Sequence, residues 1–258
     1  MSLLAVQDLD KSFGGVVAAR AVSFGLDRGE MLAVIGPNGA GKSTVFNMIG
    51  GQLRPDGGTI RLEGGDITGL APRERFRKGV GRTFQVAQTF LSMTVAENVQ
   101  MALISRHGES RALGTPARRR HREAALALLD RVGMAEAADR AGSMLAYGDV
   151  KRVELAIALA GAPTLLVMDE PTAGMAPRER AALMDLTAAI AANDRIGVLF
   201  TEHDMDVVFG HANRVLVLVR GEIIARGAPD AIRRDPRVRE AYLGDATALA
   251  PPAAGAPA

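Results

Sequence analysis

Runs of apolar residues alternate along the chain with segments in which apolar residues recur every three or four positions. A continuous apolar run is typical of a strand buried in a parallel sheet, and the wider spacing is typical of a helix with one buried face. Predicted strands cover residues 31–35, 59–62, 164–168, 196–201 and 214–219. Predicted helices cover 93–103, 117–134, 150–160 and 178–192, and another begins near Val45. Strands alternating with helices predict an α/β fold with a mostly parallel sheet and helices on its faces.

The middle and the end of the chain depart from this alternation. Between about residues 86 and 155 helical segments follow one another, so this stretch is expected to be an insertion into the α/β part. Residues 246–258 are rich in Ala and Pro and have no apolar periodicity, which predicts a disordered tail.

Composition excludes several classes of protein. Of the 258 residues 48% are hydrophobic and the net charge is +2, which excludes a disordered chain. Cysteine is absent, which excludes a disulfide scaffold and thiolate chemistry. No apolar run approaches the roughly 18 residues of a membrane-spanning helix, and the first residues are not typical of a secretory signal. Aromatic residues make up only 4%, and 31 basic residues face 29 acidic ones, so nucleic acid is not an expected partner.

The motif with the clearest chemistry follows the strand predicted at 31–35. Its sequence, GPNGAGKST, fits the phosphate-loop pattern and lies between a strand and a helix, as that pattern requires. Glycines let the backbone wrap around phosphates, while Lys42 would reach the β- and γ-phosphates of a nucleotide and Ser43 would bind Mg²⁺. The residues expected to hold the nucleotide are Gly36, Asn38, Gly39, Ala40, Gly41, Lys42, Ser43 and Thr44.

Two carboxylates end the strand predicted at 164–168. Asp169 would hold Mg²⁺, and Glu170 would act as the general base that polarises the attacking water. Taken alone, the pair is more typical of two solvated acids at a strand end. Together with a phosphate loop, it predicts nucleotide hydrolysis.

Two further polar residues follow predicted strands or loops. His203 would bond the γ-phosphate and hold the water and Glu170 in register, although a lone His at a strand end often has a structural role. Gln85 would sense the γ-phosphate and Mg²⁺, but a Gln in a loop is uninformative by itself.

A Gly-containing loop, LAYGD at 145–149, leads into the helix predicted at 150–160. The positive end of the helix dipole makes such a loop a candidate anion site. Asp149 is also a candidate N-cap of that helix.

In this order along the chain, these motifs resemble those of the ATP-binding subunits of ABC transporters. The resemblance covers about residues 3 to 245. It implies a RecA-like P-loop NTPase core with a small antiparallel β subdomain (1–85 and 156–245) and an inserted helical subdomain (86–155), forming one ABC ATPase domain over 1–245.

The resemblance also implies a dimer in which each ATP lies between one subunit's phosphate loop and the other's signature loop. In this chain the signature residues are Ala146, Tyr147, Gly148 and Asp149. Phe13 matches the aromatic residue that stacks on adenine, with a role in the small core as the alternative. Lys42, Glu170 and His203 are the implied catalytic residues, and Ser43, Gln85 and Asp169 the implied Mg²⁺ residues.

Further motifs narrow the resemblance to the larger ATPase subunit of branched-chain amino acid importers. They are KSFGG at 11–15, RTFQ at 82–85, MTVAENV at 93–99, LAYGD at 145–149 and AYLG at 241–244. The implied protein is a peripheral ATPase on the cytoplasmic face of the inner membrane. Its implied partners are an identical or second ATPase subunit, transmembrane permease subunits and, indirectly, a periplasmic solute-binding protein.

Alternatives to this function are a lipopolysaccharide-type export ATPase and a soluble ABC ATPase with no role in transport. The signature departs from the general family pattern, because Ala146 and Tyr147 stand where Ser and Gly are usual. Val150 and Ala176 replace the usual Gln after the signature and the usual acid or amide before the helix at 178–192.

Two surface features complete the expectations. Phe90, Leu91 and Met93 are expected to line the groove that receives a coupling helix of the permease, although alone they are typical of ordinary core. The basic run at 118–122 is typical of a solvated helix start, with binding of lipid headgroups or nucleic acid as the alternative.

Overall fold

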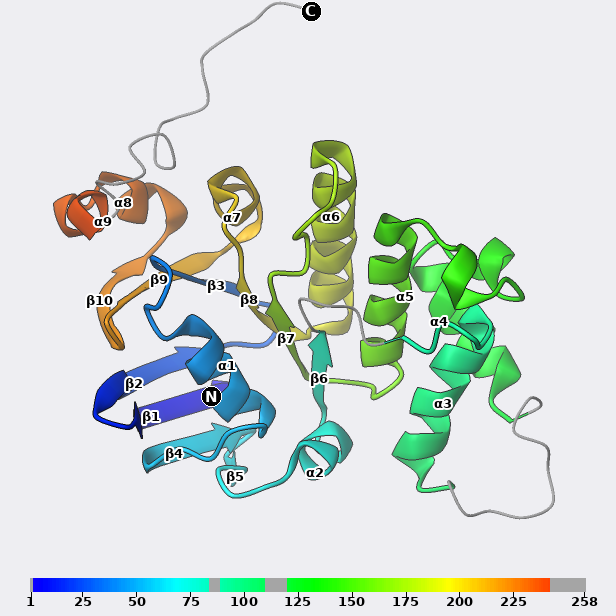
Figure 1. The fold of residues 1–258 in the computed structure, drawn as a ribbon, viewed down its shortest axis with the longest axis horizontal. Coiled ribbons are helices and arrows are strands. Elements are labelled where there is room, and N and C mark those ends of the chain that lie inside the picture. The colour runs from blue at the N-terminus through cyan, green and yellow to red at the C-terminus, as the bar shows by residue number, and fades with distance from the viewer. Residues whose placement is uncertain (1, 84–88, 110–119, 242–258) are drawn as a thin grey trace, which may run out of the picture.

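Two β-sheets, with helices between and around them, form the part of the chain that the computed structural model describes: residues 2–83, 89–109 and 120–241 (Figure 1). The smaller sheet is antiparallel, with strand order β2-β1-β4-β5. Its strands are β1 (Leu4–Phe13), β2 (Val16–Leu26), β4 (Gly57–Leu62) and β5 (Gly65–Asp66).

The larger sheet has six strands in the order β10-β9-β3-β8-β7-β6. They are β3 (Met31–Ile35), β6 (Val80–Thr83), β7 (Leu165–Asp169), β8 (Gly197–Thr201), β9 (Arg214–Val219) and β10 (Glu222–Gly227). All neighbours are parallel except β9 and β10, which form a hairpin. The sheet therefore agrees with the mostly parallel α/β arrangement predicted from the sequence.

Strand β3 shows why a continuous apolar run forms the centre of this sheet. Met31, Ala33 and Ile35 belong to one hydrophobic core, whereas Leu32 and Val34 belong to the other. Successive side chains of a strand point to opposite faces, so a strand covered on both faces needs apolar residues at every position.

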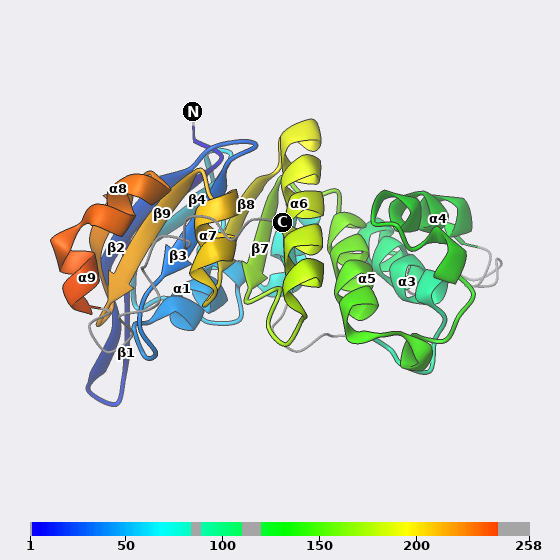
Figure 2. The same cartoon turned by 90° about the horizontal axis from the view of Figure 1, so that it is seen from above.

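The helices cover both faces of the larger sheet. They are α1 (Lys42–Gly50), α2 (Pro72–Arg77), α3 (Val95–His107), α4 (Arg122–Arg131), α5 (Tyr147–Leu159), α6 (Pro177–Asp194), α7 (Met205–His211), α8 (Pro229–Arg234) and α9 (Pro236–Ala241). Helix α1 lies between the two sheets, and α6, α7 and α8 lie on the other face of the larger sheet (Figures 1 and 2). Helices α3 and α4 lie beside the sheets, next to α5, where the sequence predicts a helical insertion (Figure 2).

Several predicted bounds differ from the structure. The described part of the helix predicted at 117–134 runs only from Arg122 to Arg131. His121, at φ 55°, precedes its first turn, and Gly133, at φ 70°, turns the chain after its end. Helix α5 begins at Tyr147, three residues before the predicted start. Its N-cap is Ala146, so the interpretation of Asp149 as the N-cap is wrong: Asp149 lies within the first turn.

Strands β1, β2, β6 and β10 were not delimited by the apolar pattern. Strand β6, for example, contains Gly81 and Arg82, and β2 has exposed positions along much of its length. These segments are strands because pairing with strands far away in the chain completes their backbone hydrogen bonds. The local pattern of apolar residues does not indicate such pairing.

A buried arginine anchors the end of α1, the helix that follows the phosphate loop. Arg75 is 1% exposed, and its Nη1 donates to the carbonyls of Met48 and Ile49, each at 2.6 Å. Its other nitrogens donate to Leu70 and Thr68 carbonyls. Burial lowers the pKa of Arg75, but the guanidinium has carbonyl partners at the negative end of the helix dipole. This cation therefore caps α1 and holds its C-terminal end in place.

Among the described residues no helix is both long and apolar enough to cross a membrane.

Candidate nucleotide-binding site

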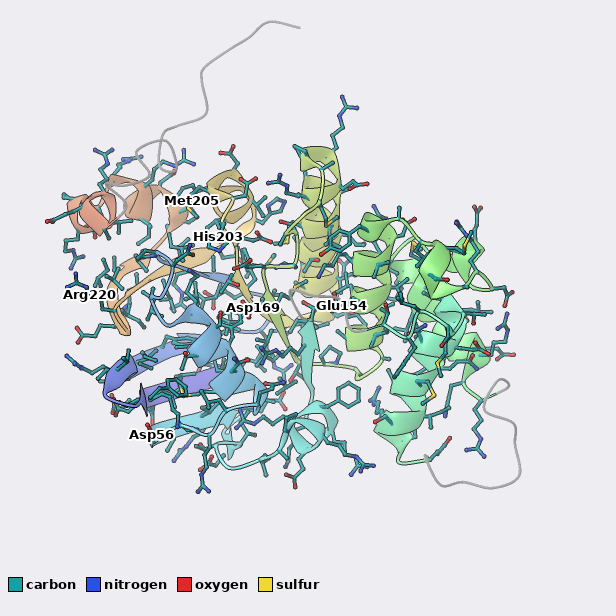
Figure 3. All side chains as sticks on the ribbon, viewed as in Figure 1. Asp56, Glu154, Asp169, His203, Met205 and Arg220 are labelled. Atoms are coloured by element: carbon teal, nitrogen blue, oxygen red, sulfur yellow. The ribbon has the colours of Figure 1, made fainter. Side chains whose placement is uncertain are left out.

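The predicted chemical residues come together because three adjacent strands are parallel. Strands β3, β8 and β7 are neighbours, so the loops that follow them meet at one edge of the sheet. These loops carry the phosphate-loop sequence, His203, and the pair Asp169 and Glu170, respectively. Figure 3 labels Asp169 and His203 at the ends of β7 and β8.

The loop between β3 and α1 depends on glycine at two close approaches. A Cβ at Gly41, whose φ is 102°, would lie 2.1 Å from the Ala18 carbonyl oxygen of β2. A Cβ at Gly36 would lie 2.1 Å from the carbonyl oxygen of Leu218. Both distances are impossible for a real side chain, so the loop requires glycine there. Gly41 precedes α1, whose first N–H groups have no partners within the helix and are available to an anion.

Lys42 lies inside this loop. It is 8% exposed, and its Nζ donates to the carbonyls of Gly36 at 2.7 Å and Pro37 at 3.2 Å. Burial lowers the pKa of Lys42, while the charges of Glu170 and Asp169 act in the opposite direction. The ammonium is therefore within electrostatic reach of both acids.

The two acids at the end of β7 are held by the neighbouring strand β8. Thr201 Oγ1 donates to Asp169 Oδ1 at 2.8 Å, and the backbone N–H of Glu170 donates to the same hydroxyl oxygen at 3.0 Å. Glu170 has a φ of 48°, which a residue with a Cβ adopts rarely and at an energetic cost. The contacts with Thr201 help to hold this backbone conformation.

His203 reaches the second acid. Its Nε2 lies 2.8 Å from Glu170 Oε1, with 54% of the His203 side chain and 17% of the Glu170 side chain exposed. The structure thus joins the two residues predicted to act on the attacking water.

A neighbouring pair was not found from the sequence. Glu202, 4% exposed, accepts hydrogen bonds at its Oε1 from the Thr172 N–H and hydroxyl, each at 2.8 Å. Burial raises the pKa of Glu202, while these hydrogen bonds oppose the rise. No sequence signal identifies the pair, because the two residues are 30 positions apart. Thr201 was missed for the same reason.

The start of α5, with the signature residues, lies away from the phosphate loop of the same chain. The Tyr147 ring lies close to the loop before α6 instead, because a Cβ built on Gly174 of that loop would lie 3.4 Å from the ring. Strand β7 lies between α1 and α5 in both ribbon views (Figures 1 and 2). Tyr147 is 45% exposed, and Asp149 lies in the first helical turn.

Phe13 ends β1 at the tip of the hairpin with β2. It is 48% exposed, so the alternative that it belongs to a small core is wrong. Lys11 Nζ lies 5.5 Å from the centre of its ring and pairs with Asp56 at 2.5 Å. The ring is therefore available for stacking.

Two other predicted features are only partly described. Gln85 lies outside the described residues, as do Arg118 and Arg119 of the basic run. Two described residues of that run have acidic partners: His121 Nε2 lies 2.9 Å from Glu109, and Arg122 pairs with Asp139 at 2.8 Å.

An exposed apolar surface lies on the helical side of the molecule. Phe90 and Leu91 are 57% and 56% exposed, so they are not ordinary core, while Met93 is half-buried. Asn98 fixes the Phe90 backbone, because its side chain accepts from the Phe90 N–H at 2.7 Å and donates to the Phe90 carbonyl.

The donors near the phosphate loop fit a magnesium ion. Ser43 and Asp169 offer a hydroxyl and a carboxylate, and Mg²⁺ prefers oxygen ligands. Among the described residues there is no cluster of three or more His, Cys, Asp or Glu side chains suited to a metal.

Comparisons with known proteins give the family. Residues 19–173 match the sequence model of the ABC transporter family, and residues 222–248 match that of the branched-chain amino acid ATP-binding cassette transporter. The chain is 42% identical to the high-affinity branched-chain amino acid transport ATP-binding protein LivG of Salmonella typhimurium, over 95% of this chain and 98% of LivG. It is 38% identical to the lipopolysaccharide export system ATP-binding protein LptB of Acidithiobacillus ferridurans, over 94% and 97% of the two chains.

Among solved structures, the fold is similar to the ADP conformation of an ATP-binding cassette from an ABC transporter. The TM-score is 0.85 at 32% identity, covering 95% of this chain and all of the other. The family match, the near-complete overlap with these relatives and the fold agree with one another. The chain therefore belongs to the ABC transporter family, as one of its nucleotide-binding ATPase subunits.

Proposed function

We propose that this chain is the ATP-binding and hydrolysing subunit of an importer for branched-chain amino acids or a closely related small solute. The observation that carries the ATPase part is the meeting of the phosphate loop, Glu170 and His203 at one edge of the larger sheet. The solute class is supported by the match of residues 222–248 and by the similarity to LivG.

In this proposal the phosphate loop holds the β- and γ-phosphates of ATP. The N–H groups of the loop and of the first turn of α1 donate to the phosphates, and the Lys42 ammonium adds a positive charge. Ser43, Asp169 and Gln85 would hold Mg²⁺, which neutralises charge on the phosphate oxygens.

Glu170 is the proposed general base for the attacking water. Its carboxylate lies on the same edge as Lys42, within electrostatic reach of the ammonium. His203, 2.8 Å from Glu170, would contact the γ-phosphate and hold the carboxylate in register.

The second half of each ATP site comes from another ATPase subunit. Strand β7 lies between α1 and α5, so the signature residues 146–149 would not meet the phosphate loop of their own chain. In the proposed dimer they would face the phosphate loop of the partner chain. Ala146 has no hydroxyl group, so the contact to the γ-phosphate would come from backbone N–H groups at the start of α5. Phe13, exposed at the hairpin tip, would stack on adenine.

The helical subdomain, proposed to span 86–155, is the docking site for the permease. Phe90 and Leu91 offer an exposed apolar surface on which a short helix of a membrane subunit would rest. The chain would then be a peripheral subunit on the cytoplasmic face of the inner membrane.

A purification from gently solubilised membranes tests this function. With the tagged chain as bait, we expect two permease subunits and a second ATPase to co-purify, and the companion binding protein to bind a branched-chain amino acid. Recovery of lipopolysaccharide-export components would support the export alternative instead. Recovery of soluble proteins alone, where a control transporter stays intact, would contradict a role in transport.

A further inference from the structure

The loops after β7 and β8 are joined by more than the contact between Glu170 and His203. Thr201, Glu202 and His203 follow one another along the chain, and each of them contacts the segment 169–172. The Thr201 hydroxyl contacts Asp169 and the Glu170 N–H, while His203 contacts the Glu170 side chain. Glu202, between them, accepts both hydrogen bonds from Thr172.

The contact between Glu202 and Thr172 is buried, unlike that of His203. Glu202 is 4% exposed and Thr172 1% exposed, whereas the His203 side chain is 54% exposed. A hydrogen bond to a carboxylate in a buried place is stronger than one at the surface, and removing its acceptor leaves buried donors unsatisfied. The pair is therefore the least solvent-exposed connection between the two loops.

The pair formed by Glu202 and Thr172 lies next to Glu170 and His203 in the chain, so it can hold the Glu170 backbone in position. Thr172 follows Glu170 after only one residue, Pro171, and Glu202 directly precedes His203. Glu170 has its backbone in the left-handed region at φ 48°, a conformation that persists only when its surroundings hold it. The Thr201 hydroxyl accepts a hydrogen bond from the Glu170 N–H, and Glu202 accepts one from the N–H of Thr172, two residues further along the chain. The backbone is therefore held both at Glu170 and just after it.

We propose that Glu202 is a positioning residue for hydrolysis, an inference that rests on the proposed role of Glu170 as the base. By accepting the two hydrogen bonds of Thr172, Glu202 fixes the loop that carries Glu170 to the loop that carries His203. Glu202 does not touch the reacting atoms in this role. Its loss allows the Glu170 carboxylate to move relative to His203 and the water, while the phosphate loop remains intact.

The expected result is a loss of kcat without a loss of ATP affinity. Misplacing a reacting group by about 1 Å costs on the order of 100-fold in rate. For Glu202→Met, which removes the acceptor and keeps the length of the side chain, we expect the kcat of ATP hydrolysis by the full chain to fall about 10- to 100-fold. The KM for ATP is expected to stay within about twofold, because the phosphate loop with Lys42 and Ser43, which holds the phosphates in the proposed function, lies outside these two loops.

A second pair of variants separates positioning from general destabilisation. Thr172→Val keeps the shape and the N–H but loses the hydroxyl donor, so a smaller fall in kcat is expected, and Thr172→Ser is expected to restore it. The matched control is Thr187→Val, because Thr187 is also fully buried and donates its hydroxyl to the Leu183 carbonyl of its own helix. This control is expected to leave kcat unchanged in folded protein.

Two outcomes would overturn the inference. One is an unchanged kcat in folded Glu202→Met and Thr172→Val protein, and the other is a rise in KM at constant kcat. Glu170→Gln serves as the reference: if it keeps full hydrolysis, the proposed base is wrong. If Glu170→Gln abolishes hydrolysis while the Glu202 and Thr172 variants are normal, only the positioning role fails.

Discussion

The imidazole Nε2 of His203 lies 2.8 Å from the Glu170 carboxylate, although the two residues are 33 positions apart in the chain. The contact exists because β7 and β8 are neighbouring parallel strands whose C-terminal ends carry both side chains. It brings together, at one sheet edge, the two residues that the sequence predicts to act on the same water.

Replacing the proposed base tests the hydrolytic role directly. For Glu170→Gln we expect ATP binding within about threefold of the wild type and hydrolysis lower by at least about 100-fold, because an amide cannot accept the proton. Nucleotide titration and phosphate release measure the two quantities. Glu136→Gln, at an exposed acid outside the site, is the control and is expected to behave as wild type. Unchanged hydrolysis in Glu170→Gln would exclude Glu170 as the base.

The close approach of the phosphate loop to β2 gives a second test. In Gly41→Ala the new Cβ would meet the Ala18 oxygen at 2.1 Å, at a φ of 102°. We expect ATP binding to be lost and the free energy of unfolding to fall by about 3 kcal/mol or more. Gly64→Ala has a comparable φ of 82° but nothing within 4 Å, so it should cost only about 1–2 kcal/mol and leave binding intact. Urea unfolding and nucleotide titration compare the two, and equal effects would contradict the steric explanation.

The exposed apolar surface predicts a separation of transport from hydrolysis. Phe90 is 57% exposed, so Phe90→Asp should change the stability of the chain by less than about 1 kcal/mol. We expect basal ATPase activity to remain and solute uptake by the assembled transporter to be lost, because a charge in an apolar docking surface costs desolvation. Met101→Asp, at another partly exposed apolar residue of the helical side, is the control and is expected to leave uptake unchanged. Normal uptake with Phe90→Asp would reject the docking assignment.

Buried Glu202 predicts a pH dependence of stability. Its pKa is raised from the ordinary 4.5, chiefly by burial and further by the charge of Glu170. The folded state then favours the protonated carboxyl, so this contribution to stability is present below pH 4.5 and is lost as the pH rises through the folded pKa. Glu202→Gln removes this titration, so its stability relative to wild type should increase between about pH 5 and pH 7. Urea unfolding at both pH values measures the difference, and a difference independent of pH would contradict the raised pKa.

Local signals along the chain were sufficient for much of the site. The phosphate loop, the acid pair and His203 were predicted because each follows a strand that is recognisable by its apolar run. Glycine at 36 and 41 was expected for the same loop, and the structure adds the reason, which is the approach of Leu218 and Ala18 carbonyls. Strands with continuous apolar runs, such as β3 and β8, were predicted near their observed bounds because both of their faces are buried.

The sequence by itself therefore determined the α/β class, the order of the chemical motifs and the residues that carry them, since these depend on local pattern and residue type. Only the tertiary structure decided the strand order β3-β8-β7, the pairing of Glu202 with Thr172, and the exposure of Phe13 and Phe90. Each of these depends on residues far apart in the chain, which meet only after long-range strand pairing and packing have closed the fold.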